Sequence, residues 1–316
     1  MDKTVLINGI KKGFSGFIWM IKIILPISYL TAVLSWLGVL GKLSILLSPL
    51  MNILGLPGIS AIPILVGALT SVYGGIAAMS VLPFTTGEMI LMANSILICH
   101  NMIQETVIQA QSGIKAWKAI AVRVTAALAT VFVLSFFINT GRHGENISLD
   151  IASLASNQSF LEMTTSWAIS IGKLCFKIFF IIMGIMIFLE IAKAKQWIEP
   201  IVKATKPILK LLGLSERVGL LWMTAVVFGL AYGGAVIVEE AKNGKIPPEE
   251  LEALQLSVAI NHSMVEDPTL FLPLGLPPLW LWIPRLIVAM IATRLFYFHL
   301  KLKQMKALRA KITTNG

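Results

Sequence analysis

One six-residue pattern, histidine-polar-methionine-aliphatic-polar-acid, occurs twice in this chain. It begins at His100 and again at His262, an offset of 162 residues. The same offset carries Arg123 onto Arg285, and an offset of 159 residues carries the Tyr-Gly-Gly sequence at 73–75 onto a second one. Self-similarity at a fixed spacing indicates a duplicated structural unit. We therefore expect the chain to fold as two related halves.

The composition places both halves in a membrane. Hydrophobic residues make up 56% of the chain, the mean hydropathy is +0.82, and charged residues are only 13%, about half the share that is usual in soluble domains. The 26 basic residues outnumber the 16 acidic ones, but they lie beside apolar segments, as the positive-inside pattern of membrane proteins requires. This pattern does not indicate nucleic-acid binding. Both cysteines lie in apolar segments, so no disulfide framework is predicted.

Six apolar segments are long enough to cross a bilayer, which takes about 20 helical residues. A shorter segment at 43–56 and its counterpart from Trp197 to Leu214 each contain a proline and end in Leu-Gly-Leu, and we expect both to lie at the membrane interface. The six predicted spans are residues 17–40, 60–82, 119–139, 168–192, 219–238 and 279–300.

The segments at 88–112 and 250–276 carry the two hexapeptides and are too polar to face lipid. The second contains four acidic residues, and one charge near the bilayer centre costs about 2.5–3.5 kcal/mol. Its Asp267-Pro268 step also disfavours a continuous helix. Each segment is predicted to enter the protein as a helix, break, and turn back.

The basic residues give an orientation. They cluster near the N-terminus, at 115–123, at 193–217 and after residue 300, and all four groups lie on one side only if both polar segments are re-entrant. We expect the protein in the cell (inner) membrane. The positive-inside rule then places both termini and residues 193–217 in the cytoplasm and Thr140–Thr165 on the outer side of that membrane. Each half crosses three times, so the second is inverted relative to the first, as in many secondary transporters.

The predicted fold is therefore an all-α integral membrane protein with two inverted-topology repeats. Each repeat should have three spanning helices, an interfacial helix and a re-entrant, broken hairpin. We expect the first repeat at 1–139, an extracytoplasmic linker at 140–166, the second repeat at 167–300 and a basic cytoplasmic tail at 301–316. We expect the chain to contact the lipid bilayer. Association with a second copy of the chain or with another membrane protein is compatible with the sequence and is not decided by it.

The duplicated unit, with Tyr-Gly-Gly in one helix and a polar, acid-bearing hairpin after it, resembles the nucleoside-recognition or Gate domain family. That family also covers the membrane cores of concentrative nucleoside transporters and of ferrous iron transport B proteins. In the nucleoside transporters a Gly-Gln-Thr-Glu-Ala-Pro string in a re-entrant hairpin contacts the nucleobase. The matching string here, Ser263–Pro268, agrees at Glu266 and Pro268. The resemblance covers nearly all of the chain and implies a transport fold without naming the substrate.

The two histidines are the centre of the predicted binding site, because ionisable residues inside a membrane usually mark a substrate or ion pathway. The glycines either line a cavity or let helices pack closely. Arg123 and Arg285 are expected either to hold the hairpins by ion pairs or to recognise an anion. No cofactor and no metal site are predicted. The predicted substrate- or ion-binding residues are Tyr73, Gly74, Gly75, His100, Asn101, Gln104, Glu105, Tyr232, Gly233, Gly234, His262, Ser263, Glu266 and Asp267.

Equivalent residues near a pseudo-two-fold axis approach each other, so His100 and His262 should meet at the centre of the protein. Two adjacent carboxylates in a dry hairpin tip need a cation, a proton or donors around them. Glu266 and Asp267 should therefore dominate ion or substrate binding, with the Gln104–Glu105 pair as the weaker half.

Three functions fit these features. Secondary transport of a small polar solute, nucleoside-like or other and coupled to protons or sodium, fits best. A divalent transition-metal transporter is the alternative, since histidine, methionine and carboxylate suit such ions, although no cysteine pair or His-x-x-x-His array occurs. A non-transporting membrane component that acts through a partner protein is the third. No nucleophile elbow, phosphate loop or metalloprotease helix occurs, so an enzyme is not expected.

Overall fold

The computed structural model describes residues 3–140, 158–197, 200, 204–244 and 246–314, and every regular element in these ranges is helical. The first half contains α1 (Lys3–Trp36), α2 (Val39–Asn52), η1 (Gly58–Ser60), α3 (Ala61–Leu69), α4 (Val72–Met79), α5 (Thr86–Cys99), α6 (Met102–Gln111) and α7 (Ala116–Ser135). The second half contains α9 (Phe160–Ala194), α11 (Lys206–Leu212), η2 (Glu216–Val218), α12 (Gly219–Lys242), α13 (Pro248–Asn261), α14 (Glu266–Thr269), η3 (Leu272–Leu274) and α15 (Pro278–Thr314).

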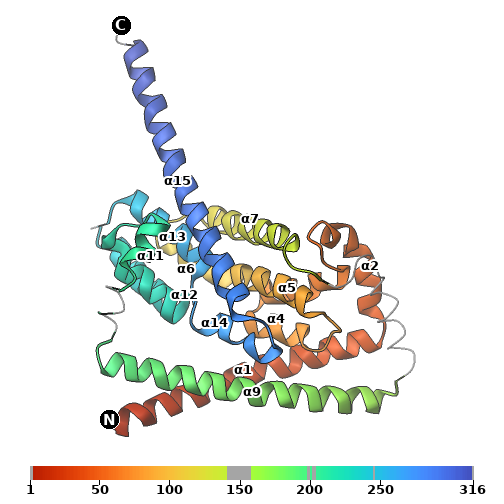
Figure 1. Ribbon diagram of the computed structural model, residues 1–316. Coiled ribbons are helices and arrows are strands. Elements are labelled where there is room, and N and C mark those ends of the chain that lie inside the picture. The colour runs from red at the N-terminus through yellow and green to blue at the C-terminus, as the bar shows by residue number, and fades with distance from the viewer. Residues whose placement is uncertain (1–2, 141–157, 198–199, 201–203, 245, 315–316) are drawn as a thin grey trace.

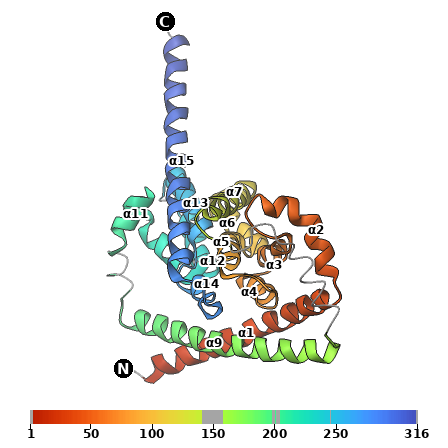
Figure 2. The same cartoon turned by 45° about the vertical axis from the view of Figure 1, so that its right-hand side comes forward.

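Helices α1 and α9 cross along one side of the molecule, and the shorter helices gather on the other side of this pair (Figures 1 and 2). Glycines allow the close crossing. A Cβ atom added at Gly9 would lie 2.8 Å from the Cα of Ile187, and one added at Gly13 would lie 2.6 Å from the Sδ of Met183. Small residues four apart let helix backbones approach in a membrane, where van der Waals packing drives association.

Within the described ranges, four helices are long and apolar enough to cross a membrane: α1, α7, α9 and the part of α15 from Pro278 to Lys306. The bent pair formed by α11 and the segment Glu216–Leu230 would make a fifth. Of the six predicted spans, the one at 60–82 is not among these helices. The predicted spans at 60–82 and 219–238 are not straight helices, because the backbone breaks inside both.

In the first half the break lies at Thr70 and Ser71, where the extended Ser71 ends α3 and caps α4 by accepting a hydrogen bond from the Gly74 amide. In the second half it lies at Gly229, whose φ of 74° and ψ of 176° interrupt α12. That conformation is open essentially to glycine alone. Tyr-Gly-Gly follows the break in both halves, so the two breaks occupy equivalent positions.

Two predicted boundaries change. Helix α9 begins at Phe160 with a Ser159–Glu162 capping box, inside the predicted linker at 140–166, of which residues 141–157 lie outside the described ranges. Helix α15 continues through residue 314, so the predicted tail at 301–316 is an extension of the last helix as far as the structure describes it (Figure 1).

The two polar segments do break and turn. In the first, a Thr85–Glu88 capping box starts α5, which ends at Cys99 before α6 leads back. In the second, α13 runs from Pro248 to Asn261 and is followed only by the four-residue α14 and the short η3. Prolines 268 and 273 lack the amide donor that a long return helix would need. Helices α5 and α13 pack together and against both α7 and α15, which brings the two turns to the interior.

Candidate ion-binding site between the two hairpins

The two hairpin turns have the same backbone conformation. His100 and His262 are extended, with φ of −62° and −66°, and each is followed by a left-handed residue: Asn101 with φ of 48° and Ser263 with φ of 49°. Left-handed residues other than glycine are uncommon, and they cluster at functional sites whose surroundings hold them in place.

Each turn is fastened to the broken helix of its own half. The Asn101 amide donates to the carbonyl of Gly67 at 3.1 Å, and the Ser263 amide donates to the carbonyl of Ala225 at 3.0 Å. These acceptors lie in the last turns before the two breaks, where helix carbonyls have lost their intrahelical partners. The breaks therefore provide the acceptors that hold the turns.

A buried arginine holds each turn from the other side. Arg123 Nε donates to the carbonyl of Ile98 at 2.7 Å, and its Nη2 donates to that of His100 at 2.5 Å. Arg285 donates in the same way to Ile260 at 3.0 Å and to His262 at 2.7 Å. Of the two predicted roles for these arginines, the structure supports holding the hairpins.

The two imidazoles face each other across the interface between the halves. The Nε2 atoms of His100 and His262 are 3.3 Å apart, as the repeat predicts, and both residues are buried. The Nδ1 atoms lie 3.1 and 2.9 Å from the carbonyls of Ile96 and Val258, one turn earlier in the same helices. A carbonyl oxygen only accepts, so each Nδ1 carries a proton, and when the ring is neutral its Nε2 presents a lone pair to the centre.

Two carboxylates complete the cluster. Glu105 Oε1 lies 3.2 Å from His100 Nε2, and Glu105 Oε2 lies 3.1 Å from His262 Nε2 and 2.8 Å from Arg123 Nη1. Asp267 Oδ2 lies 3.3 Å from His100 Nε2. We refer to His100, His262, Glu105 and Asp267 as the central cluster.

With neutral imidazoles, the central cluster brings four acceptor groups together without donors of its own. Two imidazole lone pairs and two carboxylates converge at distances of 3.1–3.3 Å, and acceptors that face one another out of water repel unless a proton or a cation lies between them. Within the described ranges, Asp267 Oδ2 has no hydrogen-bond partner. The arrangement is therefore suited to binding a cation.

The other predicted residues are divided between the cluster and its surroundings. Tyr73, on α4, donates from its hydroxyl to Glu266 Oε1 at 2.8 Å, so the first half closes over the second hairpin. Asn101 and Gln104 hydrogen-bond to each other at 3.3 Å, and the exposed Gln104 points away from the cluster. The prediction that Gln104 shares in binding is not supported by this placement, because it lies one residue off the buried face of α6 that carries Glu105.

The glycines of the Tyr-Gly-Gly sequences pack helices. A Cβ on Gly74 would meet Thr70 Oγ1 at 2.1 Å, and one on Gly75 would meet Ile96 Cδ1 at 2.9 Å. Their counterparts Gly233 and Gly234 would meet Ala225 Cα at 2.5 Å and Ile108 Cγ2 at 2.3 Å. The packing alternative therefore describes all four. The side chain of Tyr232 lies outside the described residues.

Sequence reasoning missed a buried amide network that joins the two hairpins. Gln109 Nε2 donates to Gln255 Oε1 and to its carbonyl, both at 3.2 Å, and Gln255 Nε2 donates to Ser112 Oγ at 2.6 Å. The signal was present, since these are buried amides in segments predicted to enter the membrane. Because the two glutamines are not at equivalent positions of the repeat, the duplication pattern did not select them.

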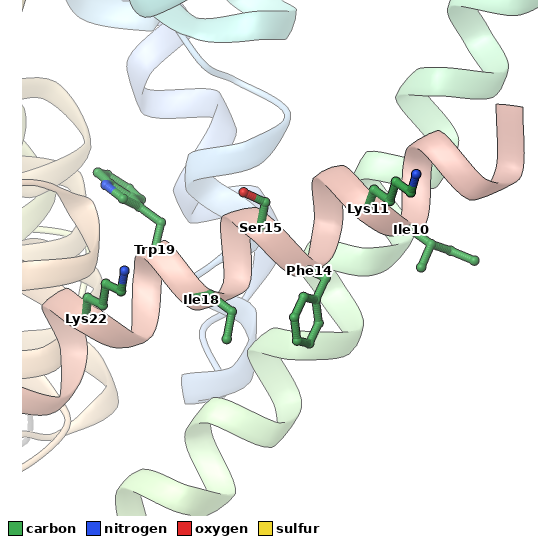
Figure 3. Close-up of a pocket in the computed structure, with 7 residues that line it drawn as sticks. All are labelled: Ile10, Lys11, Phe14, Ser15, Ile18, Trp19 and Lys22. Atoms are coloured by element: carbon green, nitrogen blue, oxygen red, sulfur yellow. The ribbon is translucent and has the colours of Figure 1, made fainter. Parts of the chain in front are cut away.

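Two hollows lie away from the central cluster. One of about 620 Å³ runs along α1, lined by Lys11, Ser15, Lys22 and apolar side chains, and no predicted site residue lines it (Figure 3). The other, of about 210 Å³, lies between the end of α1 and the start of α9. It is lined by four serine hydroxyls and two tryptophans, among other residues: Ser35, Ser80, Ser166, Ser170, Trp36 and Trp167.

Comparison with known proteins supports the membrane character. The chain is 26% identical over 291 residues to the uncharacterized membrane protein YvoD of Bacillus subtilis (strain 168), covering 92% of this chain and 93% of the relative. No family model matches the chain, and no solved structure matches it. The chain is an all-helical membrane protein, as predicted, whereas the resemblance to the Gate family stays a prediction of the sequence.

Proposed function

We propose that this protein is a secondary transporter of a small polar solute, coupled to a cation that binds at the central cluster. The observation that carries the proposal is the convergence of acceptors from both halves: two Nε2 lone pairs and two carboxylates meet in the buried interior. Ionisable groups are costly inside a membrane protein, and they are characteristic of ion pathways and proton relays.

The side chains favour a proton over sodium as the coupling cation. Hard cations take oxygen ligands, whereas half of the acceptors in the cluster are imidazole nitrogens, which bind protons near neutral pH. The carboxylates of Glu105, Glu266 and Asp267 and the guanidinium groups of Arg123 and Arg285 lie in the cluster or beside it. With neutral imidazoles these five groups carry one negative charge in excess, which one proton neutralises.

Matching elements in the two halves support the inverted-repeat architecture of the proposal. The helix breaks, the left-handed turn residues and the arginine bonds recur at equivalent positions. In transporters built from inverted repeats, broken helices meet near the midplane, and the site opens alternately to either side. The proposed location is the inner membrane, with both termini in the cytoplasm.

The hollow beside α9 fits the proposed class of solute. Four hydroxyl groups can donate or accept hydrogen bonds, and the two indole rings offer apolar faces. A volume of about 210 Å³ admits a small solute and excludes a macromolecule.

Solute binding is tested first by thermal stability. The purified full chain is heated in detergent with pools of nucleosides, amino acids, sugars and organic acids. A solute that binds the folded state raises the unfolding midpoint, and one present at 100 times its Kd stabilises by about 2.7 kcal/mol. If no pool moves the midpoint, solute transport is contradicted and the non-transporting component becomes the better interpretation.

Coupling is tested in proteoliposomes that contain a pH-sensitive dye. The active solute should move protons across the membrane, and Asp267→Asn should abolish this movement while Gln104→Ala, on the exposed face of α6, leaves it intact. Solute uptake without proton movement would overturn the proton coupling. Single cysteines at positions 158 and 206 test the topology, since only the first should react with an impermeant reagent outside the cell.

A further inference from the structure

We infer that the central cluster also binds a divalent transition-metal ion of the zinc type, in the place that the coupling proton takes in the proposed transporter. The direct ligands are His100 Nε2, His262 Nε2 and a carboxylate oxygen of Asp267, which all lie within 4.8 Å of one another. The role of the ion rests on the proposed function, whereas its binding is a property of these side chains alone.

The spacing of the donor atoms fits a single small ion. Zinc bonds to imidazole nitrogen and carboxylate oxygen are about 2.0–2.2 Å long, so tetrahedral ligands are about 3.3–3.6 Å apart. The two Nε2 atoms are 3.3 Å apart, and Asp267 Oδ2 is 3.3 Å from His100 Nε2. The ligand atoms of Asp267 and His262 lie within 4.8 Å of each other, so an ion between all three ligands requires the Asp267 side chain to move toward His262.

The imidazoles are held in the state that a metal ion requires. Metal-bound histidine nearly always donates its second ring N–H to a carbonyl or carboxylate, which fixes the tautomer and the ring orientation. Here Nδ1 of His100 and of His262 donates to the carbonyl of Ile96 and of Val258. Arg123 and Arg285 hold the carbonyls of the two histidines themselves. Both rings are therefore oriented before any ion binds.

Glu105 supplies the fourth position. Its Oε1 lies 3.2 Å from His100 Nε2 and can bind the ion or a water on it, while its Oε2 is held at 2.8 Å by Arg123. The carboxylates of Asp267 and Glu105 offset part of the charge of the ion, and Glu105 also pairs with Arg123. Two nitrogens with carboxylate oxygens suit zinc, cobalt and ferrous ions, whereas magnesium and calcium prefer oxygen alone.

Binding is measured on the full chain in detergent after removal of metal by a chelator. Titration calorimetry with Zn²⁺ should show one saturable site per chain, and Co²⁺ should produce the visible absorption of a tetrahedral nitrogen-oxygen site. Zn²⁺ added to the cobalt form should abolish that absorption. Failure to see saturable binding of either ion overturns the inference.

Variants assign the site. His100→Ala and His262→Ala should each weaken Zn²⁺ binding by more than about 100-fold, since loss of a supporting residue alone costs about 10- to 100-fold. Asp267→Asn should weaken it at least about 10-fold. His143→Ala and His299→Ala, which remove the two histidines outside the cluster, are the controls and should bind normally. His100→Gln and His262→Gln, compared by unfolding midpoint, give folded alternatives if the alanine variants fail to fold.

The outcomes separate the ion from the transport function. Zn²⁺ that binds in detergent and enters proteoliposomes loaded with a zinc indicator supports both the metal site and transport of the ion. Zinc that binds but never enters supports the metal site and contradicts transport of the ion. Proton-coupled solute uptake that persists unchanged in a strong chelator, with Zn²⁺ binding unaffected by the histidine variants, overturns the metal site and leaves the proposed function standing.

Discussion

The turns of the two hairpins share a backbone conformation, and the acids that follow them differ by one methylene group. Both have an extended histidine, a left-handed residue and an arginine that donates to the same two carbonyls. The acid five residues after the histidine is glutamate in the first hairpin and aspartate in the second. Glu105 Oε2 lies 2.8 Å from Arg123 Nη1, whereas Asp267 makes no ion pair with Arg285 among the described residues.

This difference divides the work between the hairpins. Glu105 is held by Arg123 and lies within ion-pair distance of both His100 and His262. The first hairpin therefore provides a fixed carboxylate whose charge is balanced by an arginine. Among the described residues Asp267 lies within ion-pair distance of His100 alone, and we expect it to be the carboxylate that moves toward an ion. The expectation that Glu105 belongs to the weaker half therefore needs revision: it is an anchored member of the cluster, and Glu266, which the sequence placed beside Asp267, is directed to Tyr73.

The largest expected effect separates the two arginines. Arg123→Met removes two carbonyl bonds and the ion pair, leaves Glu105 buried and unpaired, and should lower the free energy of unfolding by about 3–5 kcal/mol. Arg285→Met removes only the carbonyl bonds and should cost about 1–3 kcal/mol. Unfolding in detergent mixtures measures both, and equal losses would show that the ion pair does not distinguish the hairpins.

Exchanging the acids should reverse the asymmetry. Glu105→Asp shortens the side chain that reaches Arg123 and should cost about 1.5–3 kcal/mol, the usual contribution of a hydrogen bond to a charged group. Asp267→Glu should reach Arg285, stabilise the fold and weaken Zn²⁺ binding, because the ligand is drawn away. Calorimetry and unfolding on the same samples test this pair. Tighter metal binding in Asp267→Glu would contradict the division.

The breaks beneath the hairpins can be compared through equivalent glycines. Gly233→Ala places its Cβ 2.5 Å from the backbone of Ala225, whereas Gly74→Ala meets the rotatable hydroxyl of Thr70. Overpacking costs about 1–3 kcal/mol, and we expect Gly233→Ala near the upper end and Gly74→Ala near the lower. The unfolding midpoint is the measurement, and a larger loss in Gly74→Ala would be the contrary result.

The smallest effect is expected at the tip of the first hairpin. Gln104 is exposed, so Gln104→Ala should change the free energy of unfolding by no more than about 0.5 kcal/mol, as surface substitutions do. Zn²⁺ affinity should also stay within about two-fold. A strong loss of Zn²⁺ affinity would show that Gln104 takes part in binding and that the first hairpin moves when the ion binds.

The sequence alone predicted the helical membrane class, the two polar segments that break and the pairing of His100 with His262. These follow from composition and from the duplication, which relates residues at fixed offsets whatever the details of packing. The sequence did not locate the second turn, because the Asp267-Pro268 step lies inside α14 and the chain turns at His262 and Ser263. The helix breaks were located only approximately, since Tyr-Gly-Gly marks their neighbourhood but not the residue at which the backbone departs from helix.

Only the tertiary structure decided which side chains share the centre. No spacing along the chain relates Glu105 to His262, or Tyr73 to Glu266, because these contacts join the two halves and depend on how the hairpins pack. The metal-ligand geometry was likewise absent from the sequence, which has no His-x-x-x-His array. The distance of 3.3 Å between two histidines 162 positions apart arises because two folded hairpins pack against each other. The length of the acidic side chain decides which arginine is paired: Glu105 reaches Arg123, and Asp267, one methylene shorter, does not reach Arg285.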